Sequence, residues 1–271
     1  MTNPGIPVVL IFAGTDSSGG AGMAADIQTV SSLGGYPALV VTAVTAQDTS
    51  SVKQFSIIEP ELVVAQARAV LEDLPVAAIK TGMLGDTATI TAVASIVAEY
   101  RHIPLVVDPV LASNTGDSLI DVPIEEAIRV MLAPHAQVMT PNGPEARRLA
   151  PNADTLEACA HEIMSCGAAH VLVTGGHEGG ERVVNRLFGG NRHLDDITCP
   201  RIPGNFHGSG CTLASAVATN LAHGLPVPAA VSGAVDFTYK SIKHGYRPGM
   251  GQLVPDRLFW SRHVDVPGRP E

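Results

Sequence analysis

The residues best suited to chemistry in this chain are four small ones, Gly208, Ser209, Gly210 and Cys211, which lead into an apolar-periodic stretch. Glycine permits backbone turns that a Cβ would obstruct, so successive N–H groups in such a loop can converge. The helix predicted next adds unpaired first-turn donors and a positive dipole end, which favour an anion such as phosphate. In that first turn we expect the Cys211 thiol to lose its proton more easily than in water. The stretch predicts a phosphate cradle beside a candidate base, although a plain turn with a buried cysteine fits the same residues.

Oxygen-bearing side chains at two other predicted strand ends could hold a cation. Asp108 ends one strand and could either order a metal or cap the following turn. Asn142 and Glu145 stand three residues apart at a loop-to-helix junction, so both could face one magnesium hydration shell. The same spacing also fits a capping box, in which the two side chains bond to each other's backbone. The sequence leaves both alternatives open.

The elements that must position these residues alternate between strand and helix. Continuous apolar runs such as 8–13 predict strands buried on both faces, and helical periods follow them. Strands are expected at 8–13, 38–45, 77–81, 105–107, 137–140 and 170–174, with a hairpin of 182–188 and 193–198 turning at Gly189-Gly190. Helices are expected at 23–33, 60–73, 87–100, 124–131, 155–166, 211–223 and 227–243.

This alternation predicts an α/β fold, a three-layer α/β/α sandwich with a mostly parallel central sheet. Because loops at the carboxyl ends of parallel strands build the ligand site, the loops after these strands should converge. No linker divides the chain, so we expect a single domain over residues 1–271, with flexible ends at 1–6 and 257–271. Lys80 ends a strand and is expected to be a solvated or paired charge, and His207 a hydrogen-bonding loop residue.

Composition restricts the classes of partner. The net charge of −9 and the pI near 5.5 disfavour general binding to nucleic acid or to acidic membranes. The four cysteines show no CxxC or paired ligand spacing, which predicts reduced thiols rather than a zinc site or a disulfide framework. The first apolar run is too short to cross a bilayer, and no basic segment precedes it. We therefore expect a cytoplasmic protein that acts on a small molecule.

Two nucleotide-binding patterns compete with the cradle. Residues 20–25 read Gly-Ala-Gly-Met-Ala-Ala, which fits a dinucleotide fingerprint after a strand. The loop that begins at Gly14 is long for that tight turn, however, and Asp48 lies too far along the chain for the ribose-binding acid. A Walker loop is absent because no Gly-Lys pair occurs in the chain, so ATP would need another scaffold.

Taken together, these loops resemble the ribokinase-like superfamily, and within it the bacterial hydroxymethylpyrimidine/phosphomethylpyrimidine kinases of thiamine biosynthesis. The resemblance covers roughly residues 8–255. It is carried by segments that occur in the family's order: 13–16, 18–22 and 25–26; 42–43 and 46–47; Lys80 with 82–83; 108–110; 140–142 and 144–146; 175–177; and 207–213.

The resemblance implies an ATP- and Mg²⁺-dependent enzyme that phosphorylates a hydroxymethyl aminopyrimidine and then its monophosphate, and a homodimer. It assigns the pyrimidine pocket to Gly14, Asp26, Gln47, Met83 and Val110, with Gln47 reading the ring. It assigns catalysis to Cys211 as base with the anion hole Gly208, Ser209 and Gly210, and magnesium to Asp108, Asn142 and Glu145. ATP contacts are implied for Thr174, Gly176 and Thr212.

Two departures and two rival functions accompany this resemblance. Thr174 stands where many family members carry a lysine expected to touch ATP phosphates, and Ser209 replaces a commoner threonine. Cys211 stands where sugar kinases of the superfamily carry an aspartate, which points to pyrimidine or pyridoxal-type substrates. A pyridoxal or pyridoxine kinase is therefore the nearest alternative, and a non-catalytic pyrimidine-binding sensor is an alternative of another class.

Overall fold

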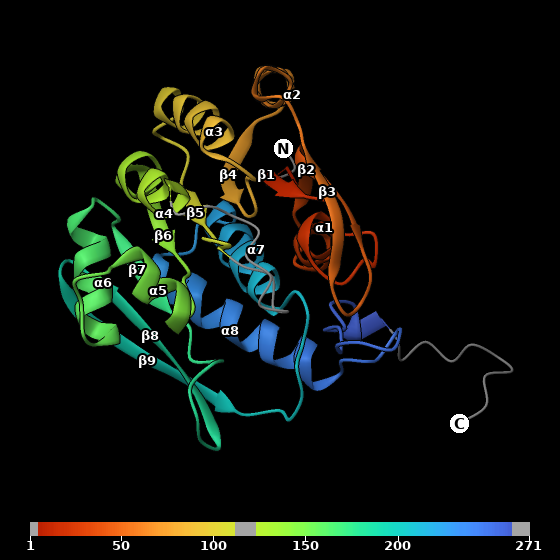
Figure 1. Ribbon diagram of the computed structural model, residues 1–271, viewed down its shortest axis with the longest axis vertical. Coiled ribbons are helices and arrows are strands. Elements are labelled where there is room, and N and C mark those ends of the chain that lie inside the picture. The colour runs from red at the N-terminus through yellow and green to blue at the C-terminus, as the bar shows by residue number, and fades with distance from the viewer. Residues whose placement is uncertain (1–4, 112–122, 262–271) are drawn as a thin grey trace, which may run out of the picture.

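The computed structural model describes residues 5–111 and 123–261 and places its nine strands in one sheet (Figure 1). The sheet order is β3-β2-β1-β4-β5-β6-β7-β8-β9. The strands are β1 (Val8–Gly14), β2 (Tyr36–Gln47), β3 (Val52–Ile57), β4 (Val76–Thr81), β5 (Leu105–Val107), β6 (Ala136–Met139), β7 (His170–Val173), β8 (Arg182–Gly189) and β9 (Arg192–Pro200). The α-helices are α1 (Gly22–Ser32), α2 (Pro60–Asp73), α3 (Thr87–Glu99), α4 (Pro123–Ala127), α5 (Gly143–Leu149), α6 (Leu156–Ser165), α7 (Ser209–Ala222) and α8 (Val227–Lys243).

The middle of the sheet is parallel. Strands β2, β1, β4, β5, β6 and β7 run in one direction, whereas β3 and β8 are antiparallel to their inner neighbours. The strand order reverses at β1, which has β2 on one side and β4 on the other. In such sheets the crevice beyond the carboxyl ends of the strands at the reversal is the usual ligand site. The mostly parallel α/β sandwich predicted from the sequence is confirmed.

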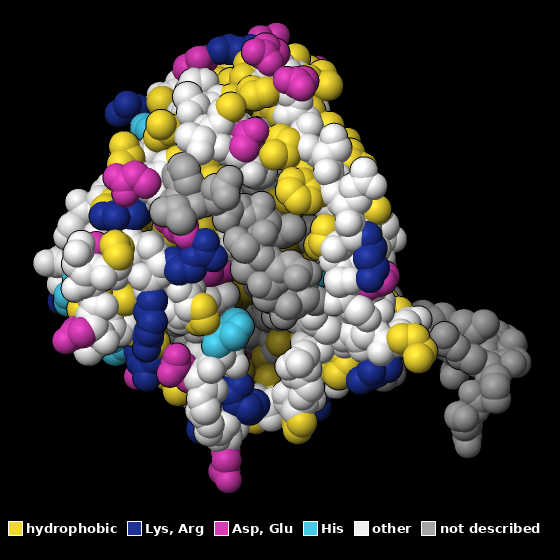
Figure 2. All heavy atoms as spheres, viewed as in Figure 1, with side chains coloured by type: hydrophobic (Ala, Val, Ile, Leu, Met, Phe, Trp, Pro, Cys, Tyr) yellow, Lys and Arg dark blue, Asp and Glu magenta, His cyan; other side chains and the backbone are white. Residues whose placement is uncertain are grey.

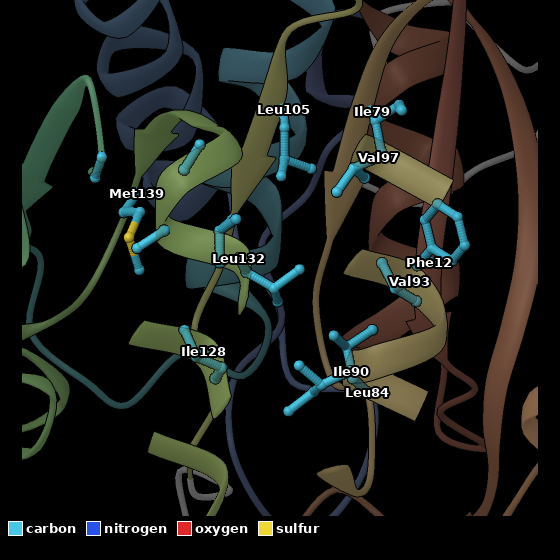
Figure 3. Packing of buried hydrophobic residues seen from close by; sticks show 14 of the residues in the cluster. Phe12, Ile79, Leu84, Ile90, Val93, Val97, Leu105, Ile128, Leu132 and Met139 are labelled. Carbon is cyan, nitrogen blue, oxygen red and sulfur yellow. The ribbon is translucent and has the colours of Figure 1, made fainter. Parts of the chain in front are cut away.

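Helices cover both faces of the sheet, and β1 contributes to both hydrophobic cores. Its side chains alternate, so that Val8, Leu10 and Phe12 pack under α2–α6, whereas Val9 and Ile11 pack under α1, α7 and α8. Figure 3 shows the first core, in which Phe12 lies beside the residues of α3 and the neighbouring strands. All seven residues of β1 are buried, because a strand covered on both faces needs an apolar residue at every position.

Local capping chemistry fixes several element boundaries where the sequence predicts them. The Asp86 carboxylate accepts a hydrogen bond from Thr89 N at 2.7 Å and begins α3. The β8–β9 hairpin turns through Gly190 and Asn191, one residue beyond the predicted Gly189-Gly190, and both have positive φ, as a two-residue hairpin requires. The expected helix 124–131 is shorter, since α4 changes into a π-helical turn over Ile128–Leu132.

Two findings at the margins of the sheet differ from expectation. Strand β3 was not predicted, because four of its six residues are exposed and its sequence lacks an apolar alternation. Arg257, placed by the sequence in a flexible end, is 1% exposed and packs inside the fold, so that prediction is wrong for this residue. Residues 1–4 and 262–271 of the predicted ends lie outside the described residues. None of the described helices is long and apolar enough to cross a membrane.

Candidate active site

The first part of the site is the N-terminus of α7. Gly208 caps this helix in the left-handed conformation, with φ of 81°, and no side chain bonds to the first turn. A Cβ on Gly208 would collide with the carbonyl oxygen of Gly20, so the loop before α7 lies directly against the loop before α1. The N–H groups of Ser209, Gly210 and Cys211 precede the first intrahelical bond and are therefore available to an anion.

The thiol of Cys211 does not have the environment that its helix position suggests. Burial raises its pKa to about 12; nearby Asp108 and Asp26 add to this rise, and the charge of Lys80 only partly opposes it. The thiol interacts with the Asp108 carboxylate and with the backbone of Gly22. The expectation of an easily lost thiol proton is wrong for this structure, because burial beside carboxylates outweighs the helix terminus.

A buried carboxyl group, Asp108, and a half-buried one, Glu145, form the acidic part of the site. Burial raises the pKa of Asp108 to about 6, against the opposing charge of Lys80. Burial and the charge of Asp108 raise the pKa of Glu145 to about 8. Oδ2 of Asp108 is buried without a hydrogen-bond partner among the described residues. These carboxyls are poorly stabilised as anions by their own surroundings, which is the situation that a bound cation would relieve.

Asn142 and Glu145 form a capping box at the start of α5. The Asn142 Oδ1 atom accepts from Glu145 N, and Glu145 Oε2 accepts from Asn142 N, both at 2.9 Å. Pro144 stands in the first turn, where its missing N–H costs nothing. Of the two alternatives from sequence, the capping box is observed. A magnesium role for this pair stays a prediction, since each carboxyl and amide oxygen retains acceptor capacity.

An ion pair lies beneath the site with no contact to solvent. Lys80 Nζ lies 3.0 Å from each carboxylate oxygen of Asp26, and the Ser215 hydroxyl donates to Asp26 Oδ1 at 2.7 Å. Burial alone would lower the pKa of Lys80, but Asp26 together with Cys211 and Asp108 outweighs burial and raises the pKa. Both side chains are 0% exposed. Lys80 is thus paired, one of the two outcomes expected from the sequence. Asp26 is bound by Lys80 and Ser215 and does not line the cavity described below, and its place in the pyrimidine pocket stays a prediction.

Gln47, the predicted ring reader, belongs to a hydrogen-bonded chain with His207 and Asp16. His207 Nε2 lies 2.7 Å from Gln47 Nε2 and 3.0 Å from Asp16 Oδ2. Burial would raise the pKa of Asp16, but hydrogen bonds from His207, Ser18 and Ala21 lower it to about 2. The donor and acceptor roles in this chain depend on the tautomer of His207.

A cavity of about 480 Å³ joins these parts. It lies at the carboxyl ends of the parallel strands and reaches α8. Figure 2 shows this face of the molecule hollowed next to the residues drawn in grey, with apolar side chains at the bottom. Predicted site residues that line the cavity are Asp108, Val110, Asn142, Glu145, Thr174, Gly176, Gly208, Ser209, Gly210 and Cys211.

Other predicted residues lie outside the lining of this cavity. Gly14 and Met83 are neighbours, because a Cβ on Gly14 would lie 3.4 Å from the Met83 sulfur. Gln47 reaches the cavity only through His207, which lines it. Thr212 is 0% exposed and donates its hydroxyl to the Gly208 carbonyl, and an ATP contact at this residue stays a prediction.

Comparison with protein families identifies this arrangement. The family model described as phosphomethylpyrimidine kinase matches residues 16–256. The chain belongs to the phosphomethylpyrimidine kinase family. The predicted resemblance is confirmed, and membership makes the chain a phosphotransferase.

Relatives of the family match most of this chain. A hydroxymethylpyrimidine/phosphomethylpyrimidine kinase of Rhizobium meliloti is 39% identical over 90% of this chain and 94% of its own length. One of Streptomyces coelicolor is 39% identical over 90% of this chain and 92% of its own. The chain spans only 50% of a thiamine biosynthesis bifunctional protein of Geobacter sulfurreducens, with which it is 39% identical.

Solved structures of two kinds of kinase are similar to this fold. The ADP complex of Bacillus subtilis pyridoxal kinase has a TM-score of 0.87 at 29% identity, over 95% of this chain and 99% of that one. Phosphomethylpyrimidine kinase of Clostridium difficile has a TM-score of 0.75 at 35% identity, over 88% of this chain and all of that one. The backbone of this family member therefore also matches kinases of a different vitamin.

Two arginines that sequence reasoning missed support the loops of this family site. Arg257 contacts both glycine loops, and Arg201 donates to the carbonyls of Gly176 and Gly180 at 2.8 Å each. Both make contacts far along the chain, so no local pattern marks them.

Proposed function

We propose that this protein is an ATP-dependent kinase that phosphorylates 4-amino-5-hydroxymethyl-2-methylpyrimidine and then its monophosphate, in thiamine biosynthesis. The names of its relatives in Rhizobium and Streptomyces support this function. The observation that carries it is one cavity lined both by the amides at the start of α7 and by the carboxyls of Asp108 and Glu145. Phosphoryl transfer depends on positioning and on charge stabilisation, and these are the two functions that such groups provide.

The start of α7 would receive the transferred phosphoryl group. Three amides, those of Ser209, Gly210 and Cys211, have no intrahelical acceptor, and the left-handed Gly208 orients the turn before them. The helix dipole adds positive potential at the same point. Only the thiolate of Cys211 can take the proton of the substrate hydroxyl, and its raised pKa keeps the thiol neutral in the free protein. We propose that the thiol first passes its own proton to the Asp108 carboxylate, with which it interacts, and that the thiolate then takes the substrate proton.

Magnesium belongs to the proposal because the residues present fit it. Asp108 Oδ2 is buried without a partner among the described residues, and Glu145 has a raised pKa, so both would gain from a cation. Their oxygens, with that of Asn142, are the hard ligands that Mg²⁺ prefers. The described residues include no cluster of three or more His, Cys, Asp or Glu that could hold a metal, so the proposed ion would take its remaining ligands from phosphate and water. When bound, the ion neutralises phosphate charge.

The pyrimidine would lie between the ends of β1, β2 and β4. Gly14 and Met83 are neighbours there, and Val110 lines the cavity. Gln47, held by His207, is proposed to present its amide group to the ring nitrogens. ATP is proposed at the other end of the cavity, against Thr174 and Gly176.

The test is a turnover panel with purified protein, ATP and Mg²⁺. Hydroxymethylpyrimidine, its monophosphate and pyridoxal are each supplied, and ADP release is measured with phosphorus NMR of the products. We expect kcat/KM for the pyrimidine alcohol to exceed that for pyridoxal. Absence of pyrimidine turnover would refute the proposal, and tight pyrimidine binding without ADP release would favour a sensor.

Pyridoxal kinase activity is the second candidate. The observation that favours it is the TM-score of 0.87 with the Bacillus subtilis pyridoxal kinase, against 0.75 with the Clostridium phosphomethylpyrimidine kinase. The same panel decides between them through the ratio of the two kcat/KM values.

A homodimer in the cytoplasm completes the proposal. Val44, 50% exposed on β2, and Phe55, 38% exposed on β3, are apolar side chains on opposite faces of this edge of the sheet, and a second subunit could cover either one. Light scattering after gel filtration measures the mass, and a monomer at micromolar concentration would contradict the dimer. The four cysteines are unpaired, as expected of a reducing compartment.

A further inference from the structure

Arg257 lies behind the cradle and joins three segments that are distant in sequence. Its Nε donates to Thr212 Oγ1 at 2.8 Å, and its Nη2 donates to the Gly20 carbonyl at 2.6 Å. The same Nη2 lies 3.4 Å from the Gly208 carbonyl, and Nη1 donates to Gln28 Oε1 at 3.3 Å. The side chain is 1% exposed, so these contacts replace water completely.

All four acceptors of Arg257 are electrically neutral. No carboxylate of the described chain forms an ion pair with it within 4.0 Å. Asp26 and Asp16 are near enough to act on its pKa, but Lys80 and His207 respectively bind them. Burial lowers the pKa of Arg257, yet a guanidinium starts so far above neutrality that it keeps its charge. A buried cation without a contacting anion destabilises the folded state. A bound anion nearby would offset this cost.

The contacts of Arg257 direct this charge toward the cradle. The Gly208 carbonyl belongs to the peptide unit whose N–H is that of Ser209, the first free donor of α7. A cation at the carbonyl end polarises the peptide and makes its N–H a stronger donor. The charge also adds to the helix dipole in a region from which water is excluded.

We propose that Arg257 supplies, through the Gly208–Ser209 peptide, the fixed positive charge that holds the terminal phosphate of ATP at the start of α7. This inference rests on the proposed kinase function. It gives the cradle a cation although Thr174, which lines the same cavity, has none. Arg257 is a positioning residue, because it acts through the backbone amides and does not itself line the cavity.

The test compares two nucleotides by calorimetry in magnesium buffer. AMP-PCP carries the third phosphate position and ADP does not, so their affinity ratio reports on the cradle alone. Arg257→Gln is expected to lower AMP-PCP affinity about tenfold or more while ADP affinity changes within threefold. Arg257→Lys keeps the charge and should restore most of the ratio. Gln28→Leu removes one neutral acceptor and should leave the ratio unchanged.

Two results would overturn the proposal: an unchanged ratio in Arg257→Gln, or equal losses in the Gln and Lys variants, which would indicate a clamp without an electrostatic role. Because a misfolded variant loses both nucleotides together, Arg257→Ala is also titrated with added guanidinium or with urea, its neutral isostere. Recovery of AMP-PCP binding by guanidinium alone supports the role of charge, and equal responses to the two additives contradict it. If the wild-type protein binds neither nucleotide, the kinase function itself fails.

Discussion

Asp26 and Asp108 are both buried aspartates near Cys211, yet the protein treats them in opposite ways. Asp26 has Lys80 at 3.0 Å from both oxygens and a hydroxyl from Ser215, so its charge is fully matched. Asp108 Oδ2 has no hydrogen-bond partner among the described residues, and burial raises its pKa to about 6. A carboxylate with complete internal partners fixes structure, whereas one without them is available to a ligand.

This difference separates the carboxylates that stabilise the fold from those available to bind a ligand. The Lys80–Asp26 pair ties β4 to α1 under the start of α7, and Lys80 contacts both oxygens of Asp26. Asp108 and Glu145 face the cavity and lack matched charges. Substitutions at the first pair should therefore change stability, and substitutions at the second should change catalysis.

The largest expected effect is on folding, in Lys80→Met. This change leaves the Asp26 carboxylate buried without its cation, which typically costs about 3–5 kcal/mol. Urea unfolding monitored by circular dichroism measures the free energy. Lys53→Met, which removes an exposed ion pair with Asp48, is the control and should show no measurable change. Comparable losses in both variants would contradict the structural role of the buried pair.

Asp108→Asn should behave in the reverse manner. Loss of the charge should lower kcat by about 10²- to 10³-fold, on the scale of lost electrostatic stabilisation. The free energy of unfolding in EDTA at pH 8 should equal or exceed that of the wild type, because an unmatched buried charge is removed. Steady-state kinetics and urea unfolding of the same preparation give both quantities. A variant that is less stable but fully active would show that Asp108, like Asp26, has a structural role.

Cys211→Ala tests the residue that lies between the two aspartates. If the thiol takes the substrate proton, kcat should fall by about 10²-fold, the usual scale for loss of a general base. A change within about threefold would leave only the amide cradle as catalytic. Alanine removes little volume, so thermal unfolding should be close to that of the wild type and separates catalysis from folding.

The smallest expected effect is pH-dependent and involves Asp16, a third aspartate with complete partners. Its folded-state pKa of about 2 lies below the ordinary value of 3.8, so its contribution to stability is present above about pH 4. That contribution is lost as the pH falls from about 4 through 2. Asp16→Asn should cost about 1–2 kcal/mol at pH 7 and almost nothing at pH 2, by unfolding at each pH. A difference in unfolding free energy that is the same at every pH would contradict the lowered pKa of Asp16.

Local patterns predicted what local chemistry decides. The buried run of β1, the Asp86 cap and the turn between β8 and β9 all follow from neighbouring residues, and each is observed. The amides at Gly208 follow similarly from two glycines before a helix. The convergence of strand-end loops follows from the parallel order alone.

The rest depended on partners far away in the chain. Lys80 and Asp26 are 54 residues apart, and neither position shows that the other is buried against it. The start of a helix would lower the pKa of the Cys211 thiol, but burial and two aspartates from other elements raise it. Strand β3 was missed since an exposed antiparallel edge needs no apolar pattern.

The contact between Arg257 and the Gly20 carbonyl also bears on the order in which the protein is made. These residues are 237 positions apart, so the loop that contains Gly20 cannot make this contact until residue 257 has been synthesised. During synthesis β1, β2 and β4 can pair long before residue 257 leaves the ribosome, because their contacts are closer in sequence. A nascent chain can therefore build the central sheet early, but it completes the support behind the start of α7 only after residue 257 has emerged.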